Sequence, residues 1–480
     1  MAMTDIQQKD ATQQQLFRLL PSVNELLLVS VCQALQSKYT REVVLTACRA
    51  AVAVLREEVS SGIHTEASLQ KCVDELPKTI SDHLVLGMRY SLRPVINATG
   101  VILHTNLGRA PLSDAALRHV VEIARDYCNL EFDLDNGLRS RRDDHVEALV
   151  LRVLAEDIGG TGENIKRGVV IVNNCAAATL LALNSIAEKS EVIVSRGELV
   201  EIGGGFRVPE IMEKSGAVMI EVGTTNRTRL ADYERALGPN TVLLLRVHQS
   251  NFSIEGFAER PLLGELITLS KRSTIPVFED LGTGLIGSLE HVGICGEPSL
   301  RQSLASGVDL VAASGDKLLG GPQCGILVGR IDLIQRIRKN PLLRAFRVDK
   351  LTYAALEATL LAYLAEDDGS IPTQRMLSIP SEELMRRCRD VVDCTRSANL
   401  VLEVVPVASL VGGGTAPKAS LPSYAISLRH ASLNAAQLID TMRKLDPPVI
   451  GRIADDLVLL DLRTVPPRFD AELASMLQTL

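Results

Sequence analysis

Residues 308–323 read VDLVAASGDKLLGGPQ, an apolar run that passes directly into glycine, aspartate and lysine. The run 308–312 predicts a strand buried on both faces, with Lys317 just beyond its carboxyl end. In open α/β sheets, ligands bind outside the carboxyl ends of the strands. A lysine there can form a Schiff base if loss of water lowers its pKa, whereas a simple ion pair with Asp316 in a turn is the structural alternative.

Short runs of the same kind recur through the middle of the chain, separated by stretches with helical spacing. They are residues 169–172, 191–195, 218–222, 242–247 and 275–278. Repeated strand, helix and strand predict the α/β class: a mostly parallel sheet covered by helices on both faces.

Changes in this pattern divide the 480 residues into three predicted domains. Residues 1–88 have apolar side chains at helical spacing and predict a helical N-terminal domain, which ends near an extended segment before Pro94. Residues 89–370 form the large α/β domain. Prolines near 372 and 380 mark the joint to a small α+β domain, 371–480, in which Gly412-Gly413-Gly414 indicates a flexible loop.

The composition excludes several classes of protein. Hydrophobic residues make up 46% of the chain and charged residues 23%, which excludes a disordered protein, and a net charge of −7 excludes a globally basic nucleic-acid-coating protein. With no CxxC pair, no HExxH and no Gly-Lys dipeptide, neither a zinc site nor a P-loop is predicted. Nine scattered cysteines, a polar N-terminus and the lack of a long apolar span predict a cytoplasmic protein with buried thiols and no membrane segment.

A second apolar run ends in a carboxylate. Residues 275–280 read IPVFED, which places Asp280 at a strand end 37 residues before Lys317. A buried aspartate keeps the ring nitrogen of pyridoxal 5′-phosphate protonated, so that the ring acts as an electron sink. A helix N-cap after a strand is the common alternative for such an aspartate, but the order of Asp280 and Lys317 favours the cofactor.

Two further segments follow strands and complete this candidate cofactor site. Asn174, Cys175 and Ala176 precede a helix whose first backbone N–H groups could bind the cofactor phosphate, although an alanine-rich helix start packed on the sheet is the simpler explanation. His248 and Asn251 follow the run 242–247 and could contact the cofactor ring or its hydroxyl, although a lone histidine is more often structural.

Basic residues gather in 330–350, where seven lysines and arginines face two acids. Arg344 and Arg347 are spaced i, i+3, so on a helix they would share one face and could bind an anion through planar guanidinium groups. Arg109, in a loop, would supply a third group. A solvated helix face explains the charges of 330–339 well, but not these two arginines among apolar neighbours.

Five long segments resemble bacterial selenocysteine synthase, the L-seryl-tRNA(Sec) selenium transferase family: 93–109, 195–204, 222–229, 314–323 and 340–350. The resemblance covers nearly the whole chain. It implies a fold-type-I pyridoxal phosphate enzyme in which Lys317 holds the cofactor, and a pocket of Arg109, Arg344 and Arg347 for the phosphate of selenophosphate. The chain departs from the family at Ser140 and Arg141, where Gly-Ser is more usual, and at Cys324, which replaces a small alanine.

The resemblance also implies a reaction and partners. Seryl-tRNA(Sec) would lose its hydroxyl to give an aminoacrylyl-tRNA, to which selenophosphate adds selenium, in a homodecamer whose N-terminal domain binds tRNA(Sec). Residues 1–85 carry eight basic and ten acidic side chains, so that contact would need a local basic face. Two alternatives are a related lyase or transferase acting on a free phosphorylated amino compound, and a catalytically silent tRNA-binding protein.

Overall fold

The computed structural model describes residues 13–155, 166–203, 205–416 and 419–480. The chain forms two compact units, Met1–Pro94 and Val95–Leu480. Most of the polar N-terminal segment used above, residues 1–12, lies outside the described residues. The division into 1–88, 89–370 and 371–480 stays a prediction.

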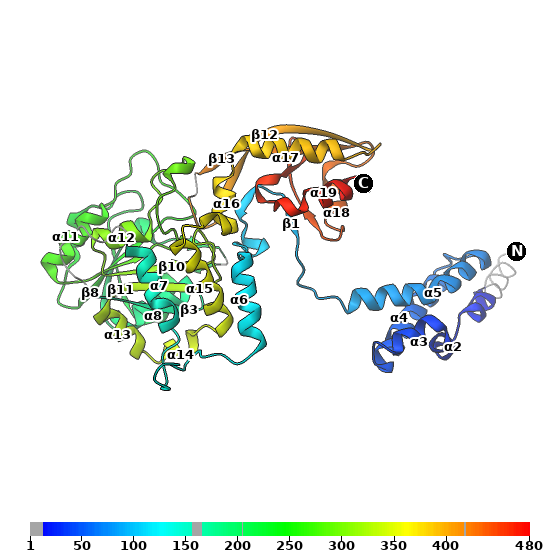
Figure 1. Cartoon of the computed structure of the whole chain (residues 1–480), viewed down its shortest axis with the longest axis horizontal. Coiled ribbons are helices and arrows are strands. Elements are labelled where there is room, and N and C mark those ends of the chain that lie inside the picture. The colour runs from blue at the N-terminus through cyan, green and yellow to red at the C-terminus, as the bar shows by residue number, and fades with distance from the viewer. Residues whose placement is uncertain (1–12, 156–165, 204, 417–418) are drawn as a thin grey trace, which may run out of the picture. The chain divides into compact units, whose positions relative to one another are not determined.

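The N-terminal unit consists of helices, as predicted (Figure 1). Its main helices are α2 (Val23–Leu28), α3 (Ser30–Gln36), α4 (Arg41–Ser60) and α5 (Glu66–Gly87). In α4, Val44, Cys48, Val52, Leu55 and Val59 recur every three or four residues, and all are buried. This apolar stripe is the surface against which α2 and α5 pack, so helical periodicity alone was enough to predict the unit.

A seven-stranded sheet forms the centre of the second unit, with strand order β3-β11-β10-β9-β8-β4-β7. The bounds are β3 (Arg167–Val172), β4 (Glu191–Ser195), β7 (Val218–Val222), β8 (Thr241–Val247), β9 (Val277–Asp280), β10 (Leu310–Ser314) and β11 (Gly325–Arg330). All run in the same direction except β11, which is antiparallel to both of its neighbours. The predicted α/β class with a mostly parallel sheet is confirmed; the antiparallel strand was not predicted.

Helices cover both faces of this sheet. Along β3, Val169 and Ile171 belong to one hydrophobic core, whereas Val170 and Val172 belong to the other, because successive side chains of a strand point to opposite faces. Helices α7 (Asp144–Leu154), α11 (Leu263–Ser273), α12 (Leu300–Ser306) and α15 (Lys350–Leu364) cover the first face; α8 (Cys175–Ala187), α9 (Val208–Ser215) and α13 (Ile331–Lys339) cover the second. Burial on both faces explains why the strands are continuous apolar runs.

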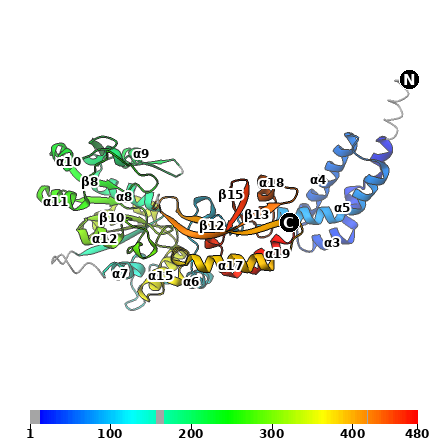
Figure 2. The ribbon, with the colours of Figure 1, turned by 90° about the horizontal axis from the view of Figure 1, so that it is seen from above.

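A second sheet, with order β15-β16-β13-β12-β2, occupies the C-terminal part of this unit. Its strands are β2 (Val101–Leu103), β12 (Leu400–Gly412), β13 (Ser420–His430), β15 (Arg452–Ala454) and β16 (Leu457–Asp461). The two longest, β12 and β13, form an antiparallel pair that extends as a curved ribbon in Figure 2. Strand β12 was not predicted, although its residues are mostly apolar, and most of its side chains are only partly buried or exposed.

Helices α17 (Ser381–Cys394), α18 (Ala435–Met442) and α19 (Asp470–Leu477) pack on the second sheet. Arg387 of α17 is buried beneath them: its guanidinium donates to both carboxylate oxygens of Asp470, at 2.9 and 2.7 Å, and to the carbonyls of Leu462 and Val465. A buried charge with this many partners fixes the helix on the sheet and is costly to disturb.

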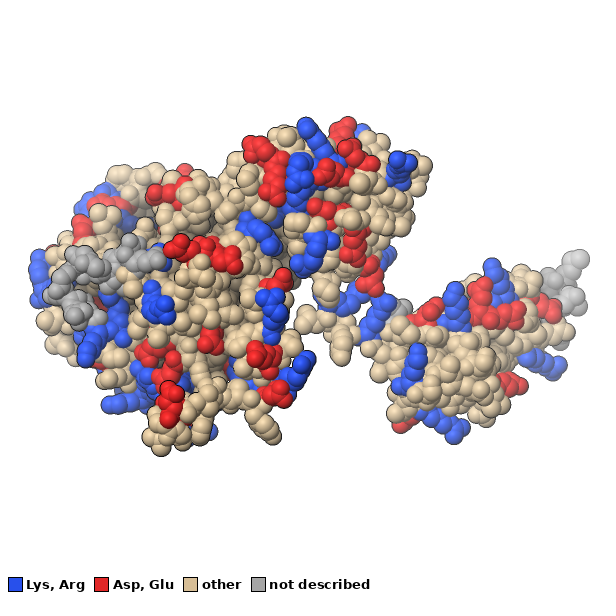
Figure 3. All heavy atoms as spheres, viewed as in Figure 1, with Lys and Arg blue, Asp and Glu red and all other residues tan. Residues whose placement is uncertain are grey.

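On the face shown in Figure 3, acidic and basic side chains are interspersed over both units. In the described ranges no single helix is long and apolar enough to cross a membrane, although the bent pair Gln13–Leu28 and Ser30–Gln36 meets that test by length and composition. The prediction that the cysteines are buried is correct for Cys32, Cys48, Cys324 and Cys388, but wrong for Cys295 and Cys394, which lie at exposed positions in a loop and at a helix end.

Candidate active site

Lys317 and Asp280 lie side by side at the carboxyl edge of the central sheet. Asp280 is the last residue of β9 and pairs in register with Ala312 of the adjacent parallel strand β10, which leads into the turn that carries Lys317. The lysine is 6% exposed and the aspartate 7%. A methyl group on Gly282 would lie 3.8 Å from Asp280 Oδ1 and 3.9 Å from Lys317 Nζ, so both groups border the same space.

Burial perturbs both groups. Loss of water lowers the pKa of Lys317, and the positive charge of Arg109 lowers it further. Burial also raises the pKa of Asp280, against the opposing effect of its hydrogen bonds and of Lys317. A lysine that loses its proton readily is a competent nucleophile toward an aldehyde. A buried carboxyl with a raised pKa favours a positively charged partner, because that partner would restore its ionised form.

The glycine turn after β12 closes over the lysine. Lys317 Nζ donates a hydrogen bond of 3.3 Å to the carbonyl oxygen of Gly414. A Cβ atom at Gly414, whose φ is +83°, would lie 2.6 Å from Nζ and 3.0 Å from Cε. The prediction of a flexible loop here is therefore incomplete, because Gly414, Thr415 and Ala416 are buried and Gly414 contacts the lysine.

Helix α8 orients the aspartate. Thr179 Oγ1 donates to Asp280 Oδ2 at 3.0 Å, and Cys175 Sγ lies 3.5 Å from Asp280 Oδ1. On the other side, the backbone N–H of His248 donates to the Asp280 carbonyl at 2.9 Å. Hydrogen bonds to the ionised form oppose the cost of burying it, so the contacts of Thr179 and Cys175 keep the carboxylate in one orientation, whereas the His248 contact fixes the backbone of Asp280.

The first turn of α8 is free to accept an anion at two of its amides. The Asn174 side chain caps the helix by accepting a 2.8 Å hydrogen bond from the N–H of Ala177. The amides of Cys175 and Ala176, which come before it, have no acceptor within the helix itself. The segment 174–176 thus lies where the sequence placed it, but the Asn174 side chain acts as a cap.

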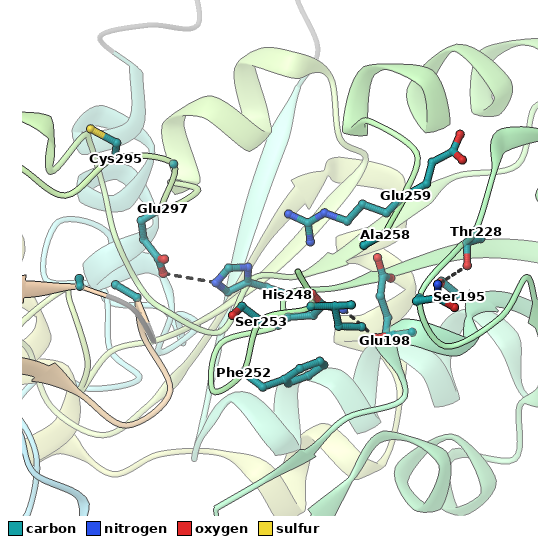
Figure 4. Close-up of a pocket in the computed structure, with 18 of the residues that line it drawn as sticks. Ser195, Glu198, Thr228, His248, Phe252, Ser253, Ala258, Glu259, Cys295 and Glu297 are labelled. Carbon is teal, nitrogen blue, oxygen red and sulfur yellow. Dashed lines mark hydrogen bonds and ion pairs between the residues drawn. The ribbon is translucent and has the colours of Figure 1, made fainter. Parts of the chain in front are cut away.

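His248 faces a separate cavity of about 700 Å³ (Figure 4). Its Nε2 lies 3.3 Å from Glu297 Oε1, and the two side chains point toward one another in the figure. Among the described residues that line this cavity are neither Lys317 nor Asp280. Asn251 is exposed, and its side-chain amide donates to the carbonyl of Glu201. Contact of either side chain with a cofactor stays a prediction.

The three predicted anion-binding arginines have different surroundings. Arg109 Nη1 forms a 2.8 Å ion pair with Asp316 Oδ2, next to Lys317. Arg347 Nη1 lies 3.3 Å from Glu131 Oε1, and Arg344 is exposed. The expectation that Arg344 and Arg347 share one helix face is wrong: α14 (Leu342–Phe346) ends before Arg347, whose backbone is extended with ψ 137°.

Sequence reasoning missed several residues at this edge. Thr179 follows Cys175 by one helical turn, so its position next to Asp280 could have been found from the helix period. Nothing local marks Gly414 or Glu131, since each reaches the site from a distant part of the chain. Across the described ranges, no group of three or more His, Cys, Asp or Glu side chains is arranged to hold a metal ion.

The sheet order and the lysine at its carboxyl edge define the fold-type-I class of pyridoxal phosphate enzymes. A solved structure of D-glucosaminate-6-phosphate ammonia-lyase shares this fold with a TM-score of 0.56, at 19% identity, over 83% of this chain and 97% of that one.

Family comparisons are more specific. Residues 95–466 match the L-seryl-tRNA selenium transferase model, and residues 17–56 match the selenocysteine synthase N-terminal model. The L-seryl-tRNA(Sec) selenium transferase of Moorella thermoacetica is 44% identical over 96% of both chains, and that of Aquifex aeolicus is 40% identical over 97% of this chain and 98% of its own. The chain belongs to the L-seryl-tRNA selenium transferase family.

Proposed function

We propose that this protein converts seryl-tRNA(Sec) to selenocysteinyl-tRNA(Sec), with pyridoxal 5′-phosphate as cofactor and selenophosphate as selenium donor. The observation that carries the proposal is the buried Lys317 beside Asp280, in a chain that matches transferases of this name along almost its entire length.

The residues at the site fit the cofactor. Lys317 would hold it covalently, Asp280 would bind the ring nitrogen, and the amides of Cys175 and Ala176 would bind its phosphate at the positive end of α8. A side chain at Gly414 would fill the space beside the amine, and glycine keeps that space open. When bound, pyridoxal phosphate draws electrons from the α-carbon of an attached amino acid, which permits loss of the α-proton and of the β-hydroxyl.

Protein groups provide the proton transfer. Burial lowers the pKa of Lys317, which favours the neutral amine that would accept a proton from the α-carbon of the serine and return it. Its hydrogen bond to the Gly414 carbonyl holds Nζ at a defined position. Asp280, oriented by Thr179, is the matching anion for a protonated ring nitrogen.

Selenophosphate carries several negative charges, for which arginine is well suited because its planar group both attracts and orients a phosphoryl group. We assign this role to Arg109, Arg344 and Arg347. Arg109 and Arg347 are each paired with a carboxylate, Asp316 and Glu131, so their guanidinium groups are already held near this edge of the sheet.

The remaining parts of the proposal concern partners. The helical unit, which includes the segment that matches the selenocysteine synthase N-terminal model, would bind tRNA(Sec). A homodecamer in the cytoplasm is the assembly and location that we propose on the strength of the family resemblance.

Reductive labelling is the direct test of the cofactor site. Purified protein is incubated with pyridoxal phosphate, reduced with borohydride and mapped by mass spectrometry; the label should lie on Lys317, and a label elsewhere contradicts the assignment. Lys317→Ala should abolish turnover and leave tRNA binding intact. Loss of both would indicate misfolding.

The affinities of the protein for seryl-tRNA(Sec) and for total tRNA distinguish the candidate functions. A clear preference for seryl-tRNA(Sec) supports the proposal, and equal binding favours an enzyme acting on a small phosphorylated amino compound. Protein that binds tRNA but is never labelled at Lys317 would be a silent binding protein.

A further inference from the structure

Glu131 lies at the centre of an arginine cluster formed by Arg139, Arg142 and Arg347. Its Oε1 accepts from Arg142 Nε at 2.7 Å and lies 3.3 Å from Arg347 Nη1; its Oε2 accepts from Arg139 Nη2 at 2.7 Å. The side chains of Glu131, Arg142 and Arg347 are each 26% exposed, and that of Arg139 is 77% exposed. Three guanidinium groups thus converge on one carboxylate.

A small cavity lies at this cluster. It has a volume of about 230 Å³ and is lined by Glu131 together with Arg142, Arg347 and Tyr353, among others. Pockets for drug-sized ligands are larger, at about 300–1,000 Å³, so the space suits a small ion. Arg142 Nη1 also donates to the carbonyl of Val348 at 2.8 Å, which fixes Arg142 beside the segment that carries Arg347.

The cluster is connected to the candidate cofactor site through the backbone. The N–H of Asn173 donates to the carbonyl of Phe346 at 3.0 Å. Asn173 directly precedes Asn174, the N-cap of α8, and Phe346 directly precedes Arg347. The arginines are therefore held next to the helix end to which we assign the cofactor phosphate.

A carboxylate and a phosphate oxyanion bind guanidinium groups in the same way, through paired N–H···O contacts. Hydrogen bonds from Arg142 first and then Arg139 lower the pKa of Glu131, so the side chain stays ionised at neutral pH. A second acid, Asp143, and two further arginines, Arg141 and Arg338, also line the cavity, so arginines outnumber carboxylates there. A second anion can therefore bind once Glu131 gives up its contacts with Arg142 and Arg347.

We propose that Glu131 is an intramolecular competitor that occupies the arginine cluster where a phosphate-type oxyanion binds, and so sets the affinity for that anion. The residue is a positioning residue: it keeps Arg142 and Arg347 converged in the empty site and is displaced by the ligand. The identity of the anion rests on the proposed function, in which the small donor selenophosphate is its source. Arg347 belongs both to this cluster and to the three arginines assigned to that donor, whereas Arg109 and Arg344 are not among the described residues that line this cavity. The size of the cavity favours this source over the backbone of a nucleic acid.

The test compares Glu131→Gln with wild type in cofactor-loaded protein, where the cofactor phosphate site is already filled. Calorimetric titration with inorganic phosphate should show a Kd lowered by about three- to tenfold in Glu131→Gln, the range expected for loss of one or two partly exposed ion pairs. Glu131→Asp, which keeps the charge, should lie closer to wild type. Glu234→Gln removes an exposed partner of Arg272 far along the sequence and should leave the Kd unchanged.

Three steady-state measurements identify the source. The KM for selenophosphate should fall in Glu131→Gln while the KM for seryl-tRNA(Sec) and the affinity for pyridoxal phosphate stay constant. A change in the tRNA value alone would assign the cluster to a backbone phosphate, and a change in cofactor affinity alone would assign it to the cofactor; either result overturns the selenophosphate assignment.

An unchanged or raised phosphate Kd in Glu131→Gln refutes the competitor role, because it means that the carboxylate is neutral or helpful to anion binding. In a background that carries both Arg142→Ala and Arg347→Ala, Glu131→Gln should have little further effect, as required if these residues act at one site. The phosphate titration needs no turnover and is independent of Lys317 labelling. Failure of the competitor role and failure of the proposed function can therefore be told apart.

Discussion

Replacement of Gly414 by alanine tests whether the glycine turn confines the side chain of Lys317. Two costs can be separated. A left-handed φ of +83° costs an alanine roughly 1–2 kcal/mol, wherever it lies. In addition, the new Cβ would lie 2.6 Å from Lys317 Nζ, so the lysine must leave its position, and an off-rotamer side chain costs about 0.5–1.5 kcal/mol.

The cost of displacing the Lys317 side chain should reduce the affinity for the cofactor. We expect the affinity of Gly414→Ala for pyridoxal phosphate, followed by absorbance and by labelling of Lys317, to fall by about two- to tenfold, since 1.4 kcal/mol is tenfold in an equilibrium constant. Gly256→Ala is the matched control: its φ is +86°, and a Cβ there would meet nothing within 4 Å. It should lose similar stability and keep its cofactor affinity. Equal cofactor affinity in the two variants would refute the idea that Gly414 positions the lysine.

Other variants test the energetics of buried charge. Asp280→Asn should stabilise the cofactor-free protein against denaturant at neutral pH and weaken cofactor binding. The pKa of Asp280 is raised in the folded state, so ionisation of this carboxyl favours the unfolded state as the pH rises through the folded pKa. Asparagine cannot ionise, so the variant lacks this destabilisation. A wild-type and mutant difference that does not shrink toward low pH would contradict this sign. Arg387→Ala should cost about 1–3 kcal/mol because it leaves the Asp470 carboxylate, which is 24% exposed, and the carbonyls of Leu462 and Val465 without their donor. Neighbouring Arg386→Ala, which breaks an exposed pair with Asp390, should cost less than about 1 kcal/mol by the same denaturation assay. Arg344→Ala and Arg347→Ala together should raise the KM for selenophosphate; unchanged kinetics would remove both from the anion site.

The central fold could be predicted because its strands are buried on both faces. The run 191–195 matches the observed strand to the residue, and its side chains are almost all buried. The run 218–222 also matches to the residue, although β7 lies at the edge of the sheet and most of its side chains are exposed or only partly buried. Strand β12 was missed although its residues are mostly apolar: it contains Pro406, a residue that argues against a strand, and most of its side chains are partly or fully exposed.

Site residues that directly follow an apolar strand could be predicted from the sequence. Site residues that come from distant parts of the chain could not. Lys317 and Asp280 follow strands, and the parallel arrangement alone places them at one edge. Gly414 is 97 residues from Lys317 along the chain, and Glu131 is 216 residues from Arg347, so no local pattern links them. The end of helix α14 before Arg347 is likewise not revealed by local spacing.

The contact between Lys317 and Gly414 joins two sheets that belong to different parts of the fold. The amine comes from the central sheet, and the carbonyl comes from the tip of the β12–β13 ribbon. A ligand that bonds to the amine of Lys317 breaks its hydrogen bond to Gly414, and with it a contact between the two sheets. Because such coupling is reciprocal, a change in the position of the ribbon must also change the affinity of the amine for that ligand. Substitutions far out on the ribbon should therefore alter cofactor occupancy without touching the cofactor.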